Sequence, residues 1–229
     1  MAIGMKEQKG SAKIKVSSNG PYLVSGNVPL AKMSIGINDK GESYEWRLEH
    51  QYPSQETYAL CRCGLSKKKP FCDGEHIKAK FDGTETADRI PYAKEAKETD
   101  GPTLKLSEAM VFCASARFCH RDEGIWKLTA KSGDAHARKI AIEEGENCPS
   151  GTLVIWDKKT GKAMEPNIEP SIVLVEDPQK GVNGPIWVRG GITIEGNDGK
   201  PYEVRNRMTL CRCGKSANKP FCDSSHYPE

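Results

Sequence analysis

The sequence predicts an α+β protein that is rich in β-strand, and three observations support this prediction. Only 37% of the 229 residues are hydrophobic, while glycine and proline occur 22 and 14 times, a balance typical of short strands and many turns. Short apolar runs bounded by glycine or Gly-Pro, as at residues 22–24 and 186–188, indicate strands. The third observation is a long internal repeat, in which two parts of the chain carry the same series of strands and turns.

The repeat ends in a string of cysteines and one histidine. Residues 61–76 read CRCGLSKKKPFCDGEH and residues 211–226 read CRCGKSANKPFCDSSH, which agree at eleven of sixteen positions. Upstream, NGPYLVSGNVPL at 19–30 aligns with NGPIWVRGGITI at 183–194, and the turns DKG and NDG follow in the two copies. Each copy is therefore predicted to run strand, turn, strand, turn, strand, and then the Cys/His string.

The segment between the copies has a different composition. Its first part is polar and interrupted by proline and glycine, which predicts a linker. Ser107 is expected to cap a helix that begins EAMVFCASARF, and Asp134 a helix that begins AHARKIAIEE. Residues 152–157 and 171–177 are predicted as strands. We therefore expect a first repeat domain, a linker, a small α+β module inserted between the repeats, and a second repeat domain, at residues 14–86, 87–103, 104–180 and 181–229.

Charge and hydropathy exclude several classes of partner. The net charge is +3 with acidic and basic residues mixed along the chain, which gives no electrostatic basis for binding nucleic acid or a membrane surface. No apolar run reaches the roughly 18 residues of a membrane span. Residues 1–16 lack the features of a secretory signal or a transit peptide. We expect a soluble, cytoplasmic protein with neither a nucleic-acid nor a membrane partner.

The nine cysteines form three groups of three, a pattern that favours metal binding over disulfides in a chain expected to be cytoplasmic. In an extended chain, the two cysteines of a C-x-C pair point to the same side and can bind one metal ion. The third cysteine and the histidine are four residues apart, so a short helix capped by Asp73 or Asp223 would place both on one face for a second ion. The candidate ligands are Cys61, Cys63, Cys72 and His76 in the first copy, and Cys211, Cys213, Cys222 and His226 in the second.

Both strings resemble the signature of the CDGSH iron–sulfur family, the mitoNEET-like proteins, in which C-x-C is followed by Ser or Thr, Pro and then C-D-G-S-H. The sequence departs from that signature at Glu75, where the family has a small residue, and at Ser224, where it has glycine. The resemblance implies one [2Fe–2S] cluster per site, with two cysteines on the inner iron and Cys plus His on the outer iron. It also implies a tandem form in which two mitoNEET-like CDGSH β-units make an intramolecular pseudo-dimer.

The function implied is electron transfer or cluster transfer. Since a histidine ligand is open to competition from protons, the clusters are expected to be acid-labile. The expected partner is a redox protein or an apo iron–sulfur acceptor, and the chain is expected to be a monomer with internal pseudo-two-fold symmetry. No phosphate-binding glycine loop or nucleophile elbow indicates an enzyme. The alternatives are a redox- or pH-sensing protein and a zinc-stapled interaction module, although zinc sites usually separate the first cysteine pair by two to four residues.

The middle cysteines, Cys113, Cys119 and Cys148, are similar to those of single-cluster ferredoxins that hold a [3Fe–4S] or a divergent [4Fe–4S] cluster. Ala116 stands where such ferredoxins have their central cysteine, so a third cluster would lack one iron or take another ligand such as His120. VFCASARFC contains no glycine, and on the predicted helix cysteines six residues apart would face different directions. The local sequence therefore favours three buried thiols over a third cluster.

Overall fold

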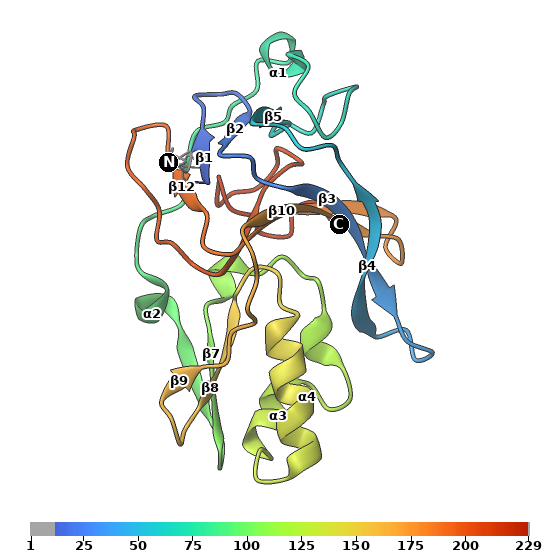
Figure 1. Cartoon of the computed structure of the whole chain (residues 1–229), viewed down its shortest axis with the longest axis vertical. Helices are drawn as coiled ribbons and strands as arrows, with labels where there is room; N and C mark the ends of the chain where they lie inside the picture. The colour runs from blue at the N-terminus through green and yellow to red at the C-terminus, as the bar shows by residue number, and fades with distance from the viewer. Residues whose placement is uncertain (1–11, 229) are drawn as a thin grey trace, which may run out of the picture.

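Three β-sheets make up the scaffold of the protein, in a computed structural model that describes residues 12–228. Two sheets pack together in the upper half of Figure 1, and the third lies below them beside two helices. Most of the N-terminal stretch on which the cytoplasmic expectation rests lies outside the described residues. Among the residues that are described, no helix is long and apolar enough to cross a membrane.

The first sheet combines strands from both copies of the repeat. Its order is β12-β1-β2-β5, formed by β1 (Lys13–Val16), β2 (Tyr22–Ser25), β5 (Thr57–Leu60) and β12 (Thr193–Glu195). Strands β1, β2 and β5 come from the first copy. Strand β12 comes from the second copy and pairs in parallel with β1, which places Ile194 opposite Ile14.

The second sheet contains the converse arrangement. Its order is β13-β11-β10-β3-β4, formed by β3 (Leu30–Ile37), β4 (Ser43–Gln51), β10 (Ser171–Asp177), β11 (Val182–Arg189) and β13 (Arg207–Leu210). Strand β3 of the first copy pairs in parallel with β10, with Leu30 opposite Ile172. The second copy thus gives β12 to the first sheet, and the first copy gives β3 and its neighbour β4 to the second sheet. The predicted series of strand, turn and strand is present in both copies.

Strand β10 lies in the segment predicted as the middle module, but it pairs with β3 and β11 in the second sheet. Its continuous apolar run explains the difference, because a central strand can bury both faces. Ile172 and Leu174 face the core shared with the first sheet. Val173 and Val175 face the opposite way, where they pack with Phe118 of the middle module.

The third sheet belongs to the middle of the chain. Its order is β6-β7-β8-β9, formed by β6 (Lys97–Asp100), β7 (Leu104–Glu108), β8 (Leu153–Asp157) and β9 (Lys162–Ala163). The helices are α1 (Glu75–Lys78), α2 (Tyr92–Glu95), α3 (Ile125–Ala130) and α4 (Ala135–Glu146), with 3₁₀ turns η1 (Met110–Phe112) and η2 (Phe118–His120). The stretch predicted as a linker contains α2 and β6, and β6 pairs with β7.

One of the two predicted helix caps is confirmed and the other is wrong. The Asp134 carboxylate accepts a hydrogen bond from the backbone N–H of Ala137, 2.9 Å away, at the start of α4. Ser107 lies instead in strand β7, where its hydroxyl accepts a hydrogen bond from the Trp156 indole. The segment pairs on both sides, with β6 and β8, and buries Leu104 and Leu106, so strand pairing overrides the capping signal.

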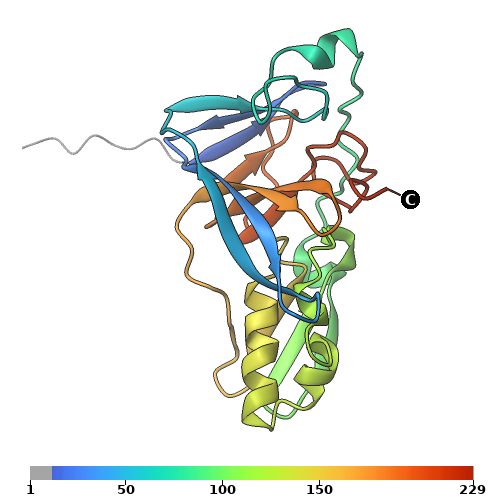
Figure 2. The same cartoon turned by 90° about the vertical axis from the view of Figure 1, so that its right-hand side faces the viewer.

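A buried arginine joins the middle module to the second copy of the repeat. Arg207, on β13, is only 1% exposed and donates hydrogen bonds to the carbonyls of Gly145 and Cys148 and to the carboxylate of Glu165. On the other side of the molecule, the β3–β4 hairpin runs down from the second sheet toward the middle module (Figure 2). There Trp46 packs against Phe118, with ring centroids 4.7 Å apart.

The two Cys/His strings meet back to back. Gly64, at φ +78°, lies so close to the other string that a Cβ atom would stand 2.7 Å from the carbonyl oxygen of Cys213. Gly214, at φ +80°, repeats the contact, and a Cβ there would stand 2.6 Å from the carbonyl oxygen of Cys63. Glycine is required at both positions because only it combines the left-handed conformation with this approach.

We predict that Gly64→Ala lowers the free energy of unfolding by about 2–4 kcal/mol, because it adds a backbone collision to the strain of a positive φ. Gly74→Ala is the matched control: its φ is +89° but nothing lies within 4 Å of the added Cβ. It should cost only the conformational strain of about 1–2 kcal/mol. Urea denaturation of the two variants measures the difference, and equal losses would show that the contact between the strings has no energetic importance.

Candidate metal centres

The C-x-C cysteines of each copy lie on one side of an extended chain. Cys61 and Cys63 follow β5 directly, and their sulfur atoms are 3.8 Å apart. Cys211 and Cys213 follow β13 in the same way, with sulfur atoms 3.6 Å apart. Two thiolates bound to one tetrahedral metal ion at about 2.3 Å would lie about 3.8 Å apart. Each C-x-C pair therefore has the spacing of two ligands on a single metal ion.

The third cysteine and the histidine form a second pair in each copy. The sulfur of Cys72 lies 3.3 Å from Nδ1 of His76, and the sulfur of Cys222 lies 3.4 Å from Nδ1 of His226. A thiolate and an imidazole on one tetrahedral ion would be about 3.5 Å apart. In both copies the nitrogen that faces the thiol is Nδ1, which identifies the ring atom available as a ligand.

The two pairs of a copy do not converge on one point. Across residues 12–228, no three Cys, His, Asp or Glu side chains come within reach of one metal ion. A single tetrahedral zinc ion would need all four donors around one centre. Two separate donor pairs instead fit a group that contains two metal ions.

An aspartate stabilises the loop between the pairs. The Asp73 carboxylate accepts hydrogen bonds from the backbone N–H groups of Lys67, at 2.7 Å, and Glu75, at 3.2 Å. Asp223 does the same for Ala217 and Ser225, at 2.7 and 3.1 Å. Desolvation opposes ionisation of both carboxyls, but these hydrogen bonds outweigh it and hold the pKa of each below its usual range.

The predicted capping role of these aspartates is wrong in its detail. Gly74, at φ +89°, is the residue before α1, and no side chain caps that helix. In the second copy the corresponding residues form a turn rather than a helix. The Cys–His spacing is the same in both copies, so it is set by the aspartate-braced loop and does not require a helix.

An arginine between the paired cysteines anchors each string. Arg62 is 2% exposed and donates hydrogen bonds to the carbonyls of Gly83, at 2.5 Å, and Ser17, at 3.3 Å. Arg212 donates to the carbonyls of Gly184, at 2.6 Å, and Val175, at 2.5 Å. The sequence prediction overlooked this role, although the alternation of an extended chain already places the middle residue of C-x-C opposite the two thiols.

Protonation of the second site favours ligation by its histidine. Burial lowers the pKa of His226 to about 4, so the imidazole is neutral at physiological pH. The hydrogen bond between Cys211 and Cys213 lowers the pKa of Cys211 to about 6 and raises that of Cys213. Burial raises the pKa of Cys222 to about 12. Metal binding therefore has to displace thiol protons at this site.

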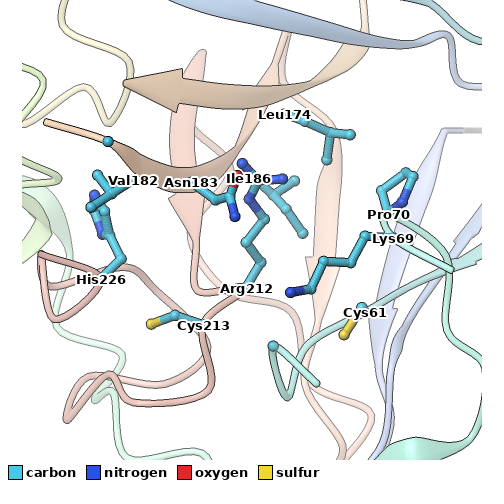
Figure 3. A pocket seen from close by; sticks show the side chains of 12 residues that line it. Cys61, Lys69, Pro70, Leu174, Val182, Asn183, Ile186, Arg212, Cys213 and His226 are labelled. Carbon is cyan, nitrogen blue, oxygen red and sulfur yellow. The ribbon is translucent and has the colours of Figure 1, made fainter. Parts of the chain in front are cut away.

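A cavity of about 280 Å³ lies between the two sites (Figure 3). Cys61 of the first site and Cys213 and His226 of the second line it, together with the basic side chains of Lys69 and Arg212. Lys67 and Lys68 are exposed beside the first site. Glu75, which distinguishes that site, forms an ion pair with Lys78 at 2.9 Å, so its charge is partly offset. Arg212 is itself ion-paired with Glu176, at 3.0 Å, so carboxylates partly offset the basic side chains around both sites.

The three middle cysteines lie around one further cavity, of about 200 Å³. Cys113, Cys119 and Cys148 all line it, and Ala116 and His120 do so as well. The helix expected over this segment is absent. The chain forms a loop between η1 and η2 in which Ser115 and Arg117 have φ of +53° and +65°.

On a helix, Cys113 and Cys119 would face different directions, and the loop removes this objection to a third cluster. The left-handed conformation of Ser115 and Arg117 bends the chain around the cavity although the segment contains no glycine. Burial raises the pKa of Cys113 and raises that of Cys119 to about 12, and the neighbouring thiol of Cys148 adds to both shifts. The three thiols therefore hold their protons until a metal displaces them. The donor set fits a cuboidal iron–sulfur group with three cysteine ligands.

Comparison with known families bears on all three sites. The family described as iron-binding zinc finger, CDGSH type, matches residues 19–77 and 183–227. The family described as divergent 4Fe-4S mono-cluster matches residues 99–158. Comparison with curated proteins and with solved structures gives no match. The chain therefore contains two iron-binding domains of the CDGSH type, which flank a divergent iron–sulfur module.

Proposed function

We propose that each Cys₃His set holds one [2Fe–2S] cluster and that the protein carries electrons or delivers clusters to other proteins. The observation that supports this most directly is the division of each donor set into a thiol pair and a thiol–imidazole pair, each with the spacing of two ligands on one ion. The inner iron would be bound by the C-x-C cysteines. The outer iron would be bound by Cys72 and His76 in the first site, and by Cys222 and His226 in the second.

A bound cluster supplies one-electron redox chemistry, and the chain sets its potential. Replacing one cysteine by a neutral histidine removes a negative charge and favours the reduced state, as in clusters with two histidine ligands. The ammonium of Lys69 and the guanidinium of Arg212 line the cavity between the sites. The positive charge of Lys69 favours the added electron, because a partly enclosed site is screened less than open surface, whereas the charge of Arg212 is partly offset by its ion pair with Glu176.

The reciprocal exchange of β3 and β12 supports a further part of the proposal. In this view the two CDGSH units pair within one chain, as an intramolecular pseudo-dimer that needs no second copy. The chain acts as a monomeric carrier rather than an enzyme, and its partners are redox proteins or apo iron–sulfur acceptors. A pH- or redox-sensing role would use the same two clusters, whereas a zinc-stapled module would need each donor set around one ion.

The middle module supports a second proposal, a third cluster of the [3Fe–4S] or [4Fe–4S] type. Cys113, Cys119 and Cys148 line one cavity, and the loop that carries the first two wraps around it. His120 lines the same cavity and is the candidate for a fourth ligand. The reading of these cysteines as three buried thiols rested on a helix that does not form.

Acid should remove the [2Fe–2S] clusters, because protons compete with iron for the imidazole. On lowering the pH from about 8 to about 3, the visible absorbance should fall, and part of the loss should occur only near or below pH 4, because burial lowers the pKa of His226 to about 4. His76→Cys and His226→Cys should each shift part of the loss to lower pH. The reason is that an anionic thiolate holds ferric iron more strongly than a neutral imidazole does. Acid profiles unchanged by either substitution would show that neither histidine is a ligand.

Iron analysis tests the third cluster. The parent protein should contain about seven or eight iron atoms, and Cys119→Ser should retain about four. Cys72→Ser is the matched control, because it should lose only the iron of the first site and leave the EPR signal of a cuboidal cluster in place. A parent protein with about four iron atoms would show that the middle cysteines are buried thiols.

A further inference from the structure

The residue after Cys-Asp in the Cys–His loop has a positive φ in both copies, but its side chain differs between them. In the first copy this position is Gly74, at φ +89°, and nothing lies within 4 Å of where its Cβ would be. In the second copy it is Ser224, at φ +74°. A non-glycine residue is strained in this region, at a cost of about 1–2 kcal/mol, so the serine calls for a compensating contact.

That contact is with the middle module. The Ser224 hydroxyl lies 3.0 Å from the backbone carbonyl of Cys113 and 2.7 Å from the hydroxyl of Ser115. It can donate to the carbonyl while it accepts from Ser115. Both partners belong to the loop that lines the three-cysteine cavity. The loop of Cys222 and His226 is therefore hydrogen-bonded directly to the middle module.

Tyr227, which follows His226, makes a second connection to the middle module. Its hydroxyl accepts a hydrogen bond from the Arg117 guanidinium at 2.8 Å and lies 2.7 Å from the Asp177 carboxylate. Arg117 and Asp177 form an ion pair at 2.7 Å, and the Asp177 side chain is fully buried. A paired and buried group of this kind is costly to open, because each charge would lose its partner.

Two more contacts hold the same side of the string. Asn218 donates a hydrogen bond from its side chain to the carbonyl of Val111, at 3.0 Å. Phe221 packs edge to face against Phe112, with ring centroids 5.4 Å apart. Cys222 is only 3% exposed as a result. Contacts before, within and after the second loop therefore all reach the middle module.

The first loop has no comparable attachment. Within residues 12–228, every hydrogen bond and ion pair from residues 73–78 stays inside residues 66–81. Ile77, which occupies the position of Tyr227, is 73% exposed. Figure 1 shows α1 at the opposite end of the molecule from the helices of the middle module. This loop can open without breaking a hydrogen bond or an ion pair of residues 73–78 to a more distant part of the protein.

We propose that the middle module locks the second site, so that the first site is the one that exchanges its cluster with a partner protein. The proposal rests on the proposed function, since it assigns different roles to the two [2Fe–2S] sites. Release of a cluster requires the Cys–His ligand pair to move away from the C-x-C pair. The free energy of this local opening depends on the contacts that must be broken as the Cys–His loop moves. The cavity between the sites reaches His226, so the difference lies in loop opening rather than in access by small molecules.

The test uses the full-length protein loaded with its clusters and mixed with an iron chelator. Samples are reduced at successive times, and the EPR signal of the two-iron clusters measures how many clusters remain. The parent should lose this signal in a fast and a slow phase of similar amplitude. Cys72→Ser, which keeps only the second site, should show the slow phase alone. Ser224→Ala keeps a Cβ at the positive φ and removes only the hydroxyl, and it should speed the slow phase about tenfold.

Two further variants separate the lock from a local defect at the metal loop. Ser115→Ala removes one of the two hydrogen bonds of the Ser224 hydroxyl, from the side of the middle module, and should speed the slow phase in the same direction but less than Ser224→Ala does. Ser225→Ala is the control for a change within the metal loop, because its hydroxyl bonds to the Asp223 carboxylate of the same loop and not to the middle module, and it should speed the slow phase less than Ser224→Ala does. A single phase in the parent, or a slow phase unaffected by Ser224→Ala and Ser115→Ala, would overturn the locked site. A parent without acid-labile sulfide would overturn the proposed function, and this assignment with it.

Discussion

The exchange of β3 and β12 between the two copies is the constraint on which the rest of the structure depends. Strand β12 pairs in parallel with β1 of the first copy, and β3 pairs in parallel with β10, which lies beside β11 of the second copy, so neither sheet is complete without strands from both copies. The shared core between the sheets holds Ile14 and Ile194 from one pairing and Leu30 and Ile172 from the other. Because β5 and β13 end at this core, the two C-x-C strings start from fixed positions and meet at Gly64 and Gly214. The spacing of the thiols follows from how the sheets are built.

Symmetry in the sheets does not extend to the surroundings of the sites. Arg207 fixes the middle module to β13, and Phe118 packs on the second sheet, where it also contacts Trp46 of the first copy. The module hydrogen-bonds to the second Cys/His string through Asn218 and Ser224. As a consequence the second Cys–His loop lies against other residues while the first projects from the molecule. Two sites with the same donor set can thereby hold their clusters with different strength. Such a difference would suit a protein that retains one cluster and transfers the other to a partner.

Sequence reasoning predicted the repeat, its strands and turns, and the Asp134 cap, because these depend on local patterns. It did not predict the features that depend on distant partners. Ser107 carries a capping signal, but pairing with β6 and β8 decides its conformation. The loop from Cys113 to Cys119 lacks glycine, and the left-handed conformations of Ser115 and Arg117 are stabilised by contacts with Ser224, Tyr227 and Asp177. The apolar run of β10 predicted a strand but not the sheet to which it belongs, because a strand with two buried faces could lie in the sheet of the middle module or in that of the second copy.

The most direct test of the account is the iron and acid-labile sulfide content of the purified protein, measured together with its molar mass. The two Cys₃His sites and the middle site together should give about seven or eight iron atoms per chain, with a similar amount of sulfide, in a monomer. Sulfide is the decisive quantity, because a binuclear cluster requires it and a single metal ion does not. About one zinc ion per Cys₃His site without sulfide would contradict the central claim that each donor set is divided between two iron atoms.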